Sequence, residues 1–233
     1  MGTTRTRRRS SRRAAQGELF ESGWGGARAG AGRKRRGPRP RVAHRARESF
    51  RPGCPVHVTL RLASGLPSLR RRATYRALLG ALGAGSERNG LRVVHWSALG
   101  NHLHLMVEAR DRRALSRGMQ GLGVRLARAL NRWWRRAGRV FADRYHARAL
   151  RSPSEVRAAL GYVLCNARRH GIALRGADPF SSGPWFDGWR GGERFEDGAA
   201  ERPGWLRAPR TWLLARGWRR RGLIDVRARH GSS

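Results

Sequence analysis

The sequence predicts an α+β domain with an antiparallel sheet, and three observations lead to this expectation. Segments 56–62 and 102–108 alternate in the way that half-buried strands do. Segments 69–82 and 111–136 repeat apolar residues every three or four positions, as amphipathic helices do. Together with strands at 91–99 and 139–150, they follow the order strand, helix, strand, strand, helix, strand. This is the split βαβ pattern of a ferredoxin-like sandwich.

The first half of the domain has clear apolar faces. Strand 56–62 places four apolar side chains on one face, namely Val56, Val58, Leu60 and Leu62. Helix 69–82 has an expected inner stripe of Ala73, Ala77, Leu78 and Leu82. Strand 91–99 is rich in β-branched and aromatic residues, and Gly100-Asn101 is a turn signal before strand 102–108. We therefore expect strands 91–99 and 102–108 to form a hairpin.

The second half contains two helices separated by a fourth strand or extended segment, 139–150. Helix 111–136 has an apolar stripe of Leu115, Met119, Leu122, Leu126, Leu130 and Trp133. The last helix begins with Ser152 as the N-cap, Pro153 in the first helical position and Glu155 to complete a capping box. Its expected buried stripe is Val156, Leu160, Val163, Leu164 and Ala167.

Composition points to a polyanionic partner. The 233 residues carry a formal net charge of +36 with a pI near 12.0, and nucleic acid is the natural partner for such a field. All the basic side chains except Lys34 are arginines, so part of this excess reflects a GC-rich coding bias. Two cysteines are too few for a disulfide framework, which favours a reduced cytosolic setting. Without a run of about 20 apolar residues, no membrane association is expected.

Two basic segments flank the expected domain. Residues 1–53 are rich in Gly, Arg and Ser, and we expect a disordered arm, either a nonspecific nucleic-acid contact or a solvated tail. Residues 176–233 form a Trp- and Arg-rich extension, with a short amphipathic helix expected at 211–224. The tryptophans of this extension either dock onto the core or face DNA.

Chemistry-bearing residues fall on the histidine strand and the last helix. His102 and His104 share one face of strand 102–108, where two imidazoles can hold a divalent metal. Tyr162 and Asn166 are spaced i,i+4 on the last helix. Each signal alone also has a structural interpretation. The two histidines can be exposed or hydrogen-bonded without binding a metal, and the tyrosine can serve only in packing. Their joint occurrence in a basic protein indicates metal-assisted phosphoryl transfer on nucleic acid.

The run 100–105, Gly-Asn-His-Leu-His-Leu, resembles the metal-binding signature of HUH (His-hydrophobic-His) nucleases. Segments 139–146 and 162–169 resemble the insertion-sequence-200-like single-tyrosine transposases, especially their REP-associated branch. The resemblance spans roughly residues 55–175, and we take 54–175 as the catalytic domain. The chain departs from the family pattern in two ways. Many relatives carry an Asn-Pro-Val-Arg run after the position of Asn166, where this chain has Ala167-Arg168-Arg169. The usual third metal ligand of the shorter relatives is a glutamine, where this chain has Asn166.

The resemblance implies a bacterial, cytoplasmic, nucleoid-associated enzyme that cuts single-stranded or hairpin DNA with Mg²⁺ or Mn²⁺. Tyr162 would be the nucleophile and would form a 5′-phosphotyrosine intermediate. His102, His104 and Asn166 would bind the metal. A homodimer, in which the tyrosine helix serves its own site or that of its partner, is left open.

Other interpretations compete with this one. A non-catalytic nucleic-acid-binding protein can share the fold and the charge, and a domesticated relative would act only at dispersed genomic repeats. Glu108 is either a second carboxylate near the metal or a solvated strand end. We expect structural roles for His57 and His95, and packing or DNA contact for Tyr145-His146. Trp133-Trp134 are expected in the core, with base stacking as the alternative.

Overall fold

A computed structural model describes residues 53–191 and 203–228. The arm predicted over 1–53 lies outside the described residues except for Gly53. The strands are β1 (Val56–Arg61), β2 (Glu87–Arg88), β3 (Leu91–Ala98), β4 (His102–Ala109) and β5 (His146–Ala149). The helices are α1 (Arg72–Gly85), α2 (Arg112–Trp133), α3 (Pro153–Leu164), α4 (Asn166–Arg169) and α5 (Trp212–Ala215), with 3₁₀ turns η1 (Gly183–Trp185) and η2 (Gly217–Arg221).

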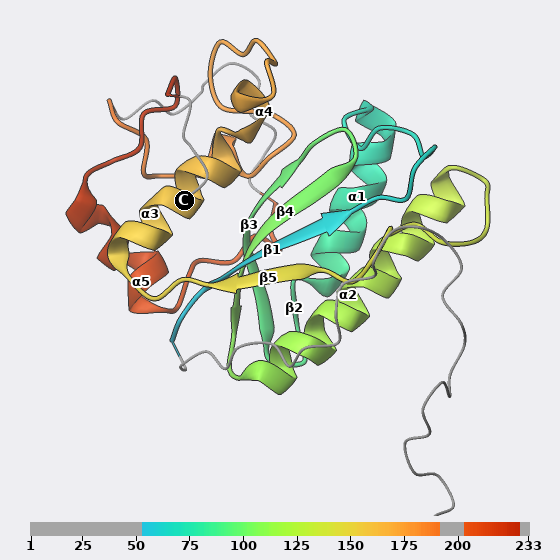
Figure 1. Cartoon of the computed structure of the whole chain (residues 1–233), viewed down its shortest axis with the longest axis horizontal. Helices are drawn as coiled ribbons and strands as arrows, with labels where there is room; N and C mark the ends of the chain where they lie inside the picture. Colours follow the sequence, from blue (N-terminus) through green and yellow to red (C-terminus); the bar gives the residue numbers. More distant parts are fainter. Residues whose placement is uncertain (1–52, 192–202, 229–233) are drawn as a thin grey trace, which may run out of the picture. The chain divides into compact units, whose positions relative to one another are not determined.

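The five strands form one antiparallel sheet in the order β2-β3-β4-β1-β5. Strand β4 is antiparallel to both β1 and β3, so β1 and β3 run in the same direction with β4 between them. This is the split βαβ arrangement, and it confirms the predicted ferredoxin-like α+β fold. Strand β4, which carries the two histidines, lies in the middle of the sheet (Figure 1).

The short edge strand β2 was not predicted. Asn89 and Gly90 both have positive φ, at 55° and 74°, and they connect β2 to β3. An Asn-Gly pair favours this conformation, because the twist of such a turn matches the twist of the flanking strands. The Asn-Gly dipeptide was therefore the available signal for β2.

Helices cover both faces of the sheet (Figure 1). Helices α1 and α2 pack on one face, where the core contains the apolar face of β1 and Leu103, Leu105 and Val107 of β4. Helix α3 packs on the other face, together with the C-terminal segment, in a second core that includes Met106, Leu160 and Trp218. The histidines of β4 lie on this second face, because their side chains alternate with those of the leucines.

Helix boundaries differ from the sequence prediction in three places. Helix α1 begins at Arg72 rather than residue 69, and it buries Thr74 and Tyr75 instead of Ala73 and Ala77, which are only partly buried. Helix α3 ends at Leu164, with Cys165 as its C-cap (φ −101°, ψ 11°), and a separate short helix follows. The segment 211–224 forms the short pieces α5 and η2 rather than one helix.

Trp133 is 52% exposed, so its predicted core position is wrong. Its neighbour Trp134 packs against the core and donates its indole N–H to Thr74 Oγ1 at 3.3 Å. The apolar stripe of α2 thus stays buried through Leu130, and the last residue of the helix lies at the surface. No helix among the described residues is long and apolar enough to cross a bilayer.

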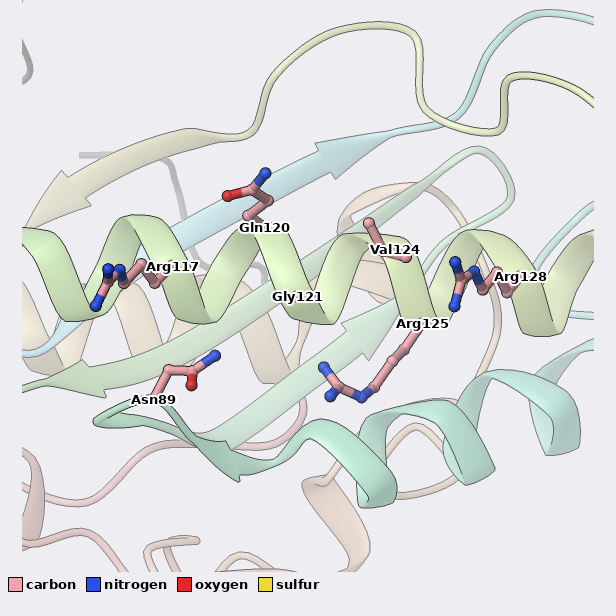
Figure 2. Close-up of a pocket in the computed structure, with 7 residues that line it drawn as sticks. All are labelled: Asn89, Arg117, Gln120, Gly121, Val124, Arg125 and Arg128. Carbon is pink, nitrogen blue, oxygen red and sulfur yellow. The ribbon is translucent and has the colours of Figure 1, made fainter.

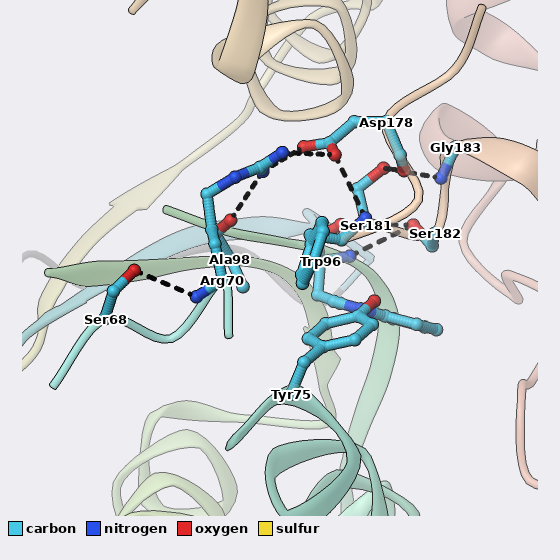
Figure 3. Close-up of polar contacts among 10 residues, drawn as sticks. Ser68, Arg70, Tyr75, Trp96, Ala98, Asp178, Ser181, Ser182 and Gly183 are labelled. Carbon is cyan, nitrogen blue, oxygen red and sulfur yellow. Dashed lines mark hydrogen bonds and ion pairs between the residues drawn. The ribbon is translucent and has the colours of Figure 1, made fainter. Parts of the chain in front are cut away.

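The C-terminal extension docks onto the domain through a buried ion pair and several aromatic rings. Figure 3 shows Arg70 and Asp178, whose two hydrogen bonds measure 2.7 and 3.0 Å. The Asp178 carboxylate is fully buried, and Arg70 also donates to Ala98 O at 3.1 Å. Four tryptophans of the extension pack into the two cores: Trp185, Trp189, Trp205 and Trp218. Docking is therefore confirmed for these four, whereas Trp212 is 50% exposed.

Candidate active site

The candidate site lies on the sheet face covered by α3. Side chains of β1 and β4 alternate, so that Val58 and Leu105 enter the α1/α2 core while Thr59 and His104 lie opposite one another on the other face. His57 lies on the same face of β1, diagonal to His104 in the register. Ser97 of β3 pairs with His104 on its other side. His104 is therefore enclosed by side chains of both neighbouring strands.

His104 is held through one ring nitrogen only. Its Nδ1 atom lies 3.1 Å from His57 Nε2 and 3.1 Å from Thr59 Oγ1. The side chain is 3% exposed, and its Nε2 atom has no hydrogen-bond partner among the described residues. A histidine that binds a metal through Nε2 commonly has its Nδ1 fixed in this way.

His102 stands beside His104 and is held in a similar way. Its Nδ1 atom lies 2.7 Å from Asn101 Oδ1, a carbonyl oxygen that can only accept a hydrogen bond, so Nδ1–H is the donor. The centroids of the His102 and His104 rings are 4.8 Å apart, and His170, which follows α4, lies 5.6 Å from the His102 ring. With Nδ1 as the donor, His102 keeps the lone pair of Nε2 for another ligand.

The electrostatics of this face keep the imidazoles neutral. Burial lowers the pKa of His104 to about 2, and the neighbouring imidazoles of His57, His102 and His170 add to the effect. Burial and the charge of Arg148 lower the pKa of His57 to about 4. The pKa of His102 is also lowered, mainly by burial. Neutral imidazole is the form that binds metal, so near neutral pH these groups are in the state a metal site requires.

Tyr162 reaches the histidines from α3. Its ring meets the His104 ring edge to face, with centroids 5.3 Å apart and planes at 86°. The His57 ring is 5.7 Å away. The guanidinium carbon of Arg169 lies 5.3 Å from the centroid of the Tyr162 ring, which is a cation–π geometry. The tyrosine, both β-strands and α4 thus meet at one place on the sheet.

Asn166 is the first residue of α4 and is completely buried. Neither its amide oxygen nor its amide nitrogen has a hydrogen-bond partner among the described residues. Buried polar atoms without a protein partner are rare, and such atoms commonly contact a bound ion or water. The rings of His102, His104 and Tyr162 are in contact with one another through His104. Asn166 makes no such ring contact and is related to the group by sequence, because it follows Tyr162 by four residues.

The chemistry of these donors fits a divalent cation. Two imidazole nitrogens and an amide oxygen are compatible with Mn²⁺ and, less typically, with Mg²⁺. The buried Nε2 of His104 and the amide oxygen of Asn166 are unpartnered atoms that such an ion would satisfy. The described residues contain no group of three or more His, Cys, Asp or Glu side chains arranged for a metal. An ion here would therefore depend on the amide as well as on the imidazoles.

Three further sequence candidates have clear positions. Glu108 is buried rather than solvated. Its carboxylate accepts hydrogen bonds of 2.7–3.0 Å from the backbone N–H groups of Arg210 and Thr211 and from the Thr211 hydroxyl. His95 has a structural contact to Ser182 Oγ at 3.2 Å, as expected. His146 is exposed on the edge strand β5.

The sequence prediction underestimated His57, which was expected to be structural. Its contact with His104 follows from the pairing of β1 with β4, because the register places the two residues on the same face. The polar alternation of His57, Thr59 and Arg61 along β1 was the available signal. His170 was also missed, although Gly171, with φ 77°, was an available signal for the turn that ends α4.

A separate basic groove runs along the outer side of α2 (Figure 2). It has a volume of about 510 Å³ and is lined by three arginines and no acidic residue. The lining residues are Asn89, Arg117, Gln120, Gly121, Val124, Arg125 and Arg128. Planar guanidinium groups spaced along an open groove are suited to phosphate oxygens.

Fold and site together define a ferredoxin-like α+β protein with an imidazole pair and a tyrosine on one face of its sheet. No family model matches this chain, and no curated protein matches it either. Among solved structures, the chain is similar to a REP-associated tyrosine transposase bound to a REP hairpin. The TM-score is 0.51 at 17% identity, over 60% of this chain and 82% of the other. At this level of identity the similarity shows a common fold.

Proposed function

We propose that this chain is a transposase-type single-stranded DNA endonuclease and strand transferase that acts through Tyr162. The observation that carries the proposal is the contact between the Tyr162 ring and His104, whose Nε2 atom has no partner among the described residues. The phenol of Tyr162, which would be the nucleophile, and the imidazole of His104, which would bind the metal, lie on one face of the sheet. The similar fold of a REP-associated tyrosine transposase bound to a REP hairpin supports the same reaction class.

In the proposed reaction, the phenol oxygen of Tyr162 attacks a phosphorus atom of the DNA backbone. The new Tyr–O–P bond forms while the bond from phosphorus to the 3′-oxygen of the preceding nucleotide breaks. The phenol proton leaves to solvent, and the departing 3′-oxygen takes up a proton to become a 3′-hydroxyl. The 5′-phosphotyrosine keeps the energy of the broken ester, so a 3′-hydroxyl can later displace the tyrosine and rejoin strands without a further cofactor.

His102, His104 and Asn166 would hold Mg²⁺ or Mn²⁺ at this site. The bound cation would stabilise the negative charge that develops on the nonbridging phosphate oxygens. The Nδ1 atom of His102 contacts Asn101, and the Nδ1 atom of His104 contacts His57 and Thr59, so neither Nδ1 atom would be a ligand of the cation. In this chain Tyr162 contacts the His104 of its own polypeptide, so the proposed site can be complete within one copy.

The test is a denaturing-gel adduct assay with labelled single-stranded DNA, including hairpins from the native flanking region. Wild-type protein should form a covalent protein–DNA band with Mn²⁺ or Mg²⁺ and none with chelator. Tyr162→Phe should form no band while it binds DNA as well as wild type, and His102→Ala should lose the metal-dependent band. Tyr145→Phe is the matched control and should keep it. Cleavage that persists in Tyr162→Phe would overturn the proposed nucleophile.

The alternative is a nucleic-acid-binding protein without catalytic activity, and the basic groove on α2 favours it. Replacement of Arg117, Arg125 and Arg128 by glutamine should weaken DNA binding and flatten its salt dependence. Each lost phosphate contact should remove about 0.7–0.9 from the slope of log affinity against log salt. The control removes equal charge from the exposed arginines 71, 72 and 76 of α1. Tight binding without an adduct on any hairpin would favour this alternative.

A further inference from the structure

We propose that His57 and Thr59 are positioning residues that set the tautomer of His104, so that its Nε2 lone pair is available for the cation. This inference rests on the proposed function, since it assigns a role at the same site. The two residues belong to β1, and neither contributes a ligand in the proposed metal set. Their effect would pass through the Nδ1 atom of His104.

The geometry gives His104 Nδ1 two acceptors. Thr59 is directly opposite His104 in the β1–β4 register, and its Oγ1 atom lies 3.1 Å from Nδ1. His57 Nε2 approaches the same nitrogen at 3.1 Å. A neutral imidazole carries one proton, and the Thr59 hydroxyl and the Nε2 atom of a neutral His57 can each accept a hydrogen bond from Nδ1–H, so a proton on Nδ1 is fully paired. The lone pair is then on Nε2.

The opposite tautomer would be costly in this environment. His104 is 3% exposed, and its Nε2 atom has no acceptor among the described residues. A proton on Nε2 would therefore leave a buried N–H without a partner, at a typical cost of about 1–3 kcal/mol. Both ends of the ring thus favour the proton on Nδ1. The planes of the His57 and His104 rings differ by only 27°, with centroids 5.2 Å apart, and this close neighbour also limits rotation of the imidazole.

The two β1 residues differ in what they supply. The Thr59 hydroxyl can accept from His104 and donate elsewhere, so it retains its function if a serine takes its place. His57 offers an acceptor nitrogen at the end of a ring, and the amide of a glutamine can reach a comparable position. The double variant Thr59→Val, His57→Phe removes both acceptors while it keeps the side chains close to their original shapes.

The first measurement is ¹⁵N NMR of the imidazole nitrogens in the metal-free full chain. Wild-type His104 should be protonated on Nδ1, and the double variant should shift toward protonation on Nε2. Thr59→Ser and His57→Gln should keep the wild-type pattern. His146→Gln, which changes an exposed residue opposite Thr59 on β5, is the matched control and should have no effect. An unchanged His104 tautomer in the double variant would overturn the inference.

The second measurement is Mn²⁺ affinity, followed by the loss of free Mn²⁺ signal in electron paramagnetic resonance. Loss of residues that orient a metal ligand typically weakens binding about 10–100-fold, and we expect this range for the double variant. Equal affinity in wild type and double variant would contradict the inference while leaving the proposed function intact. No Mn²⁺ binding by wild type would instead contradict the proposed metal site, and the NMR result would still test the tautomer.

Discussion

The Tyr162 ring lies edge to face against the imidazole of His104, with ring centroids 5.3 Å apart, although one residue belongs to α3 and the other to β4. This contact depends on the packing of α3 against the sheet face that carries the histidines. The C-terminal segment packs into the same apolar cluster as α3 and the sheet.

The buried amide of Asn166 predicts that its replacement leaves the Tm of the metal-free protein intact but removes the increase in Tm caused by Mn²⁺. Asn166→Leu should not lower the Tm of the metal-free protein, because it removes two buried polar atoms without partners among the described residues. Mn²⁺ should raise the Tm of wild type, since a ligand at 100 times its Kd stabilises by about 2.7 kcal/mol. The increase should vanish in the variant. An equal Mn²⁺-induced increase in both proteins would exclude Asn166 from the cation site.

The lowered pKa of His57 predicts that stability falls with acidification. Above pH 6.5 both the folded and the unfolded chain hold a neutral imidazole. Below it the unfolded chain binds a proton, whereas the folded chain binds one at His57 only near pH 4. Each such histidine lowers the free energy of unfolding by up to about 1.4 kcal/mol per pH unit. Urea unfolding between pH 7 and 5 should show a shallower slope for His57→Phe; equal slopes would contradict this.

The Glu108 carboxylate predicts a local effect on the C-terminal segment. Glu108→Gln should weaken the hydrogen bonds from Arg210 and Thr211, and bonds to charged groups contribute about 1.5–3 kcal/mol. Hydrogen exchange with mass spectrometry should show faster exchange in residues 203–228. Asp187→Asn, which breaks only an exposed ion pair with Arg219 in the same extension, is the control and should change the exchange much less. Unaltered exchange in Glu108→Gln would show that the segment is held by its apolar contacts alone.

The ion pair of Arg70 and Asp178 predicts a large loss of stability. Asp178→Asn leaves the guanidinium of Arg70, 14% exposed, without its charged partner. Breaking a buried pair in this way typically costs about 3–5 kcal/mol. Arg110→Gln breaks the exposed pair with Asp111 instead, and should cost far less, because solvent screens an exposed pair. Chemical denaturation measures both, and similar losses would argue against a buried anchor.

Two glycines of α2 predict opposite effects of the same substitution. A Cβ at Gly118 would collide with the Leu91 side chain, so Gly118→Ala should destabilise the contact of α2 with β3. A Cβ at Gly123 meets nothing within 4 Å. Gly123→Ala should therefore stabilise by about 0.5–1 kcal/mol through helix propensity. Thermal unfolding of both variants is the measurement, and stabilisation by Gly118→Ala would show that Leu91 can move aside.

The sequence alone determined the order of the main elements and their inner faces. Alternation along β1 and β4 is a local property, because successive strand side chains point to opposite faces whatever lies beyond them. The start of α3 is equally local: Ser152 accepts from the Glu155 N–H at 3.2 Å, with Pro153 in the first turn. Such signals need no information about distant parts of the chain.

Tertiary structure alone decided which residues meet. His57 reaches His104 only because β1 and β4 pair in a particular register, and Glu108 is buried only because a segment about a hundred residues later docks on its carboxylate. Likewise, Trp133 fits the apolar period of α2 but extends beyond the covered surface, so it is exposed. Periodicity specifies the face of an element, whereas burial and contact depend on which other element covers that face, and this long-range packing is not encoded in any local pattern.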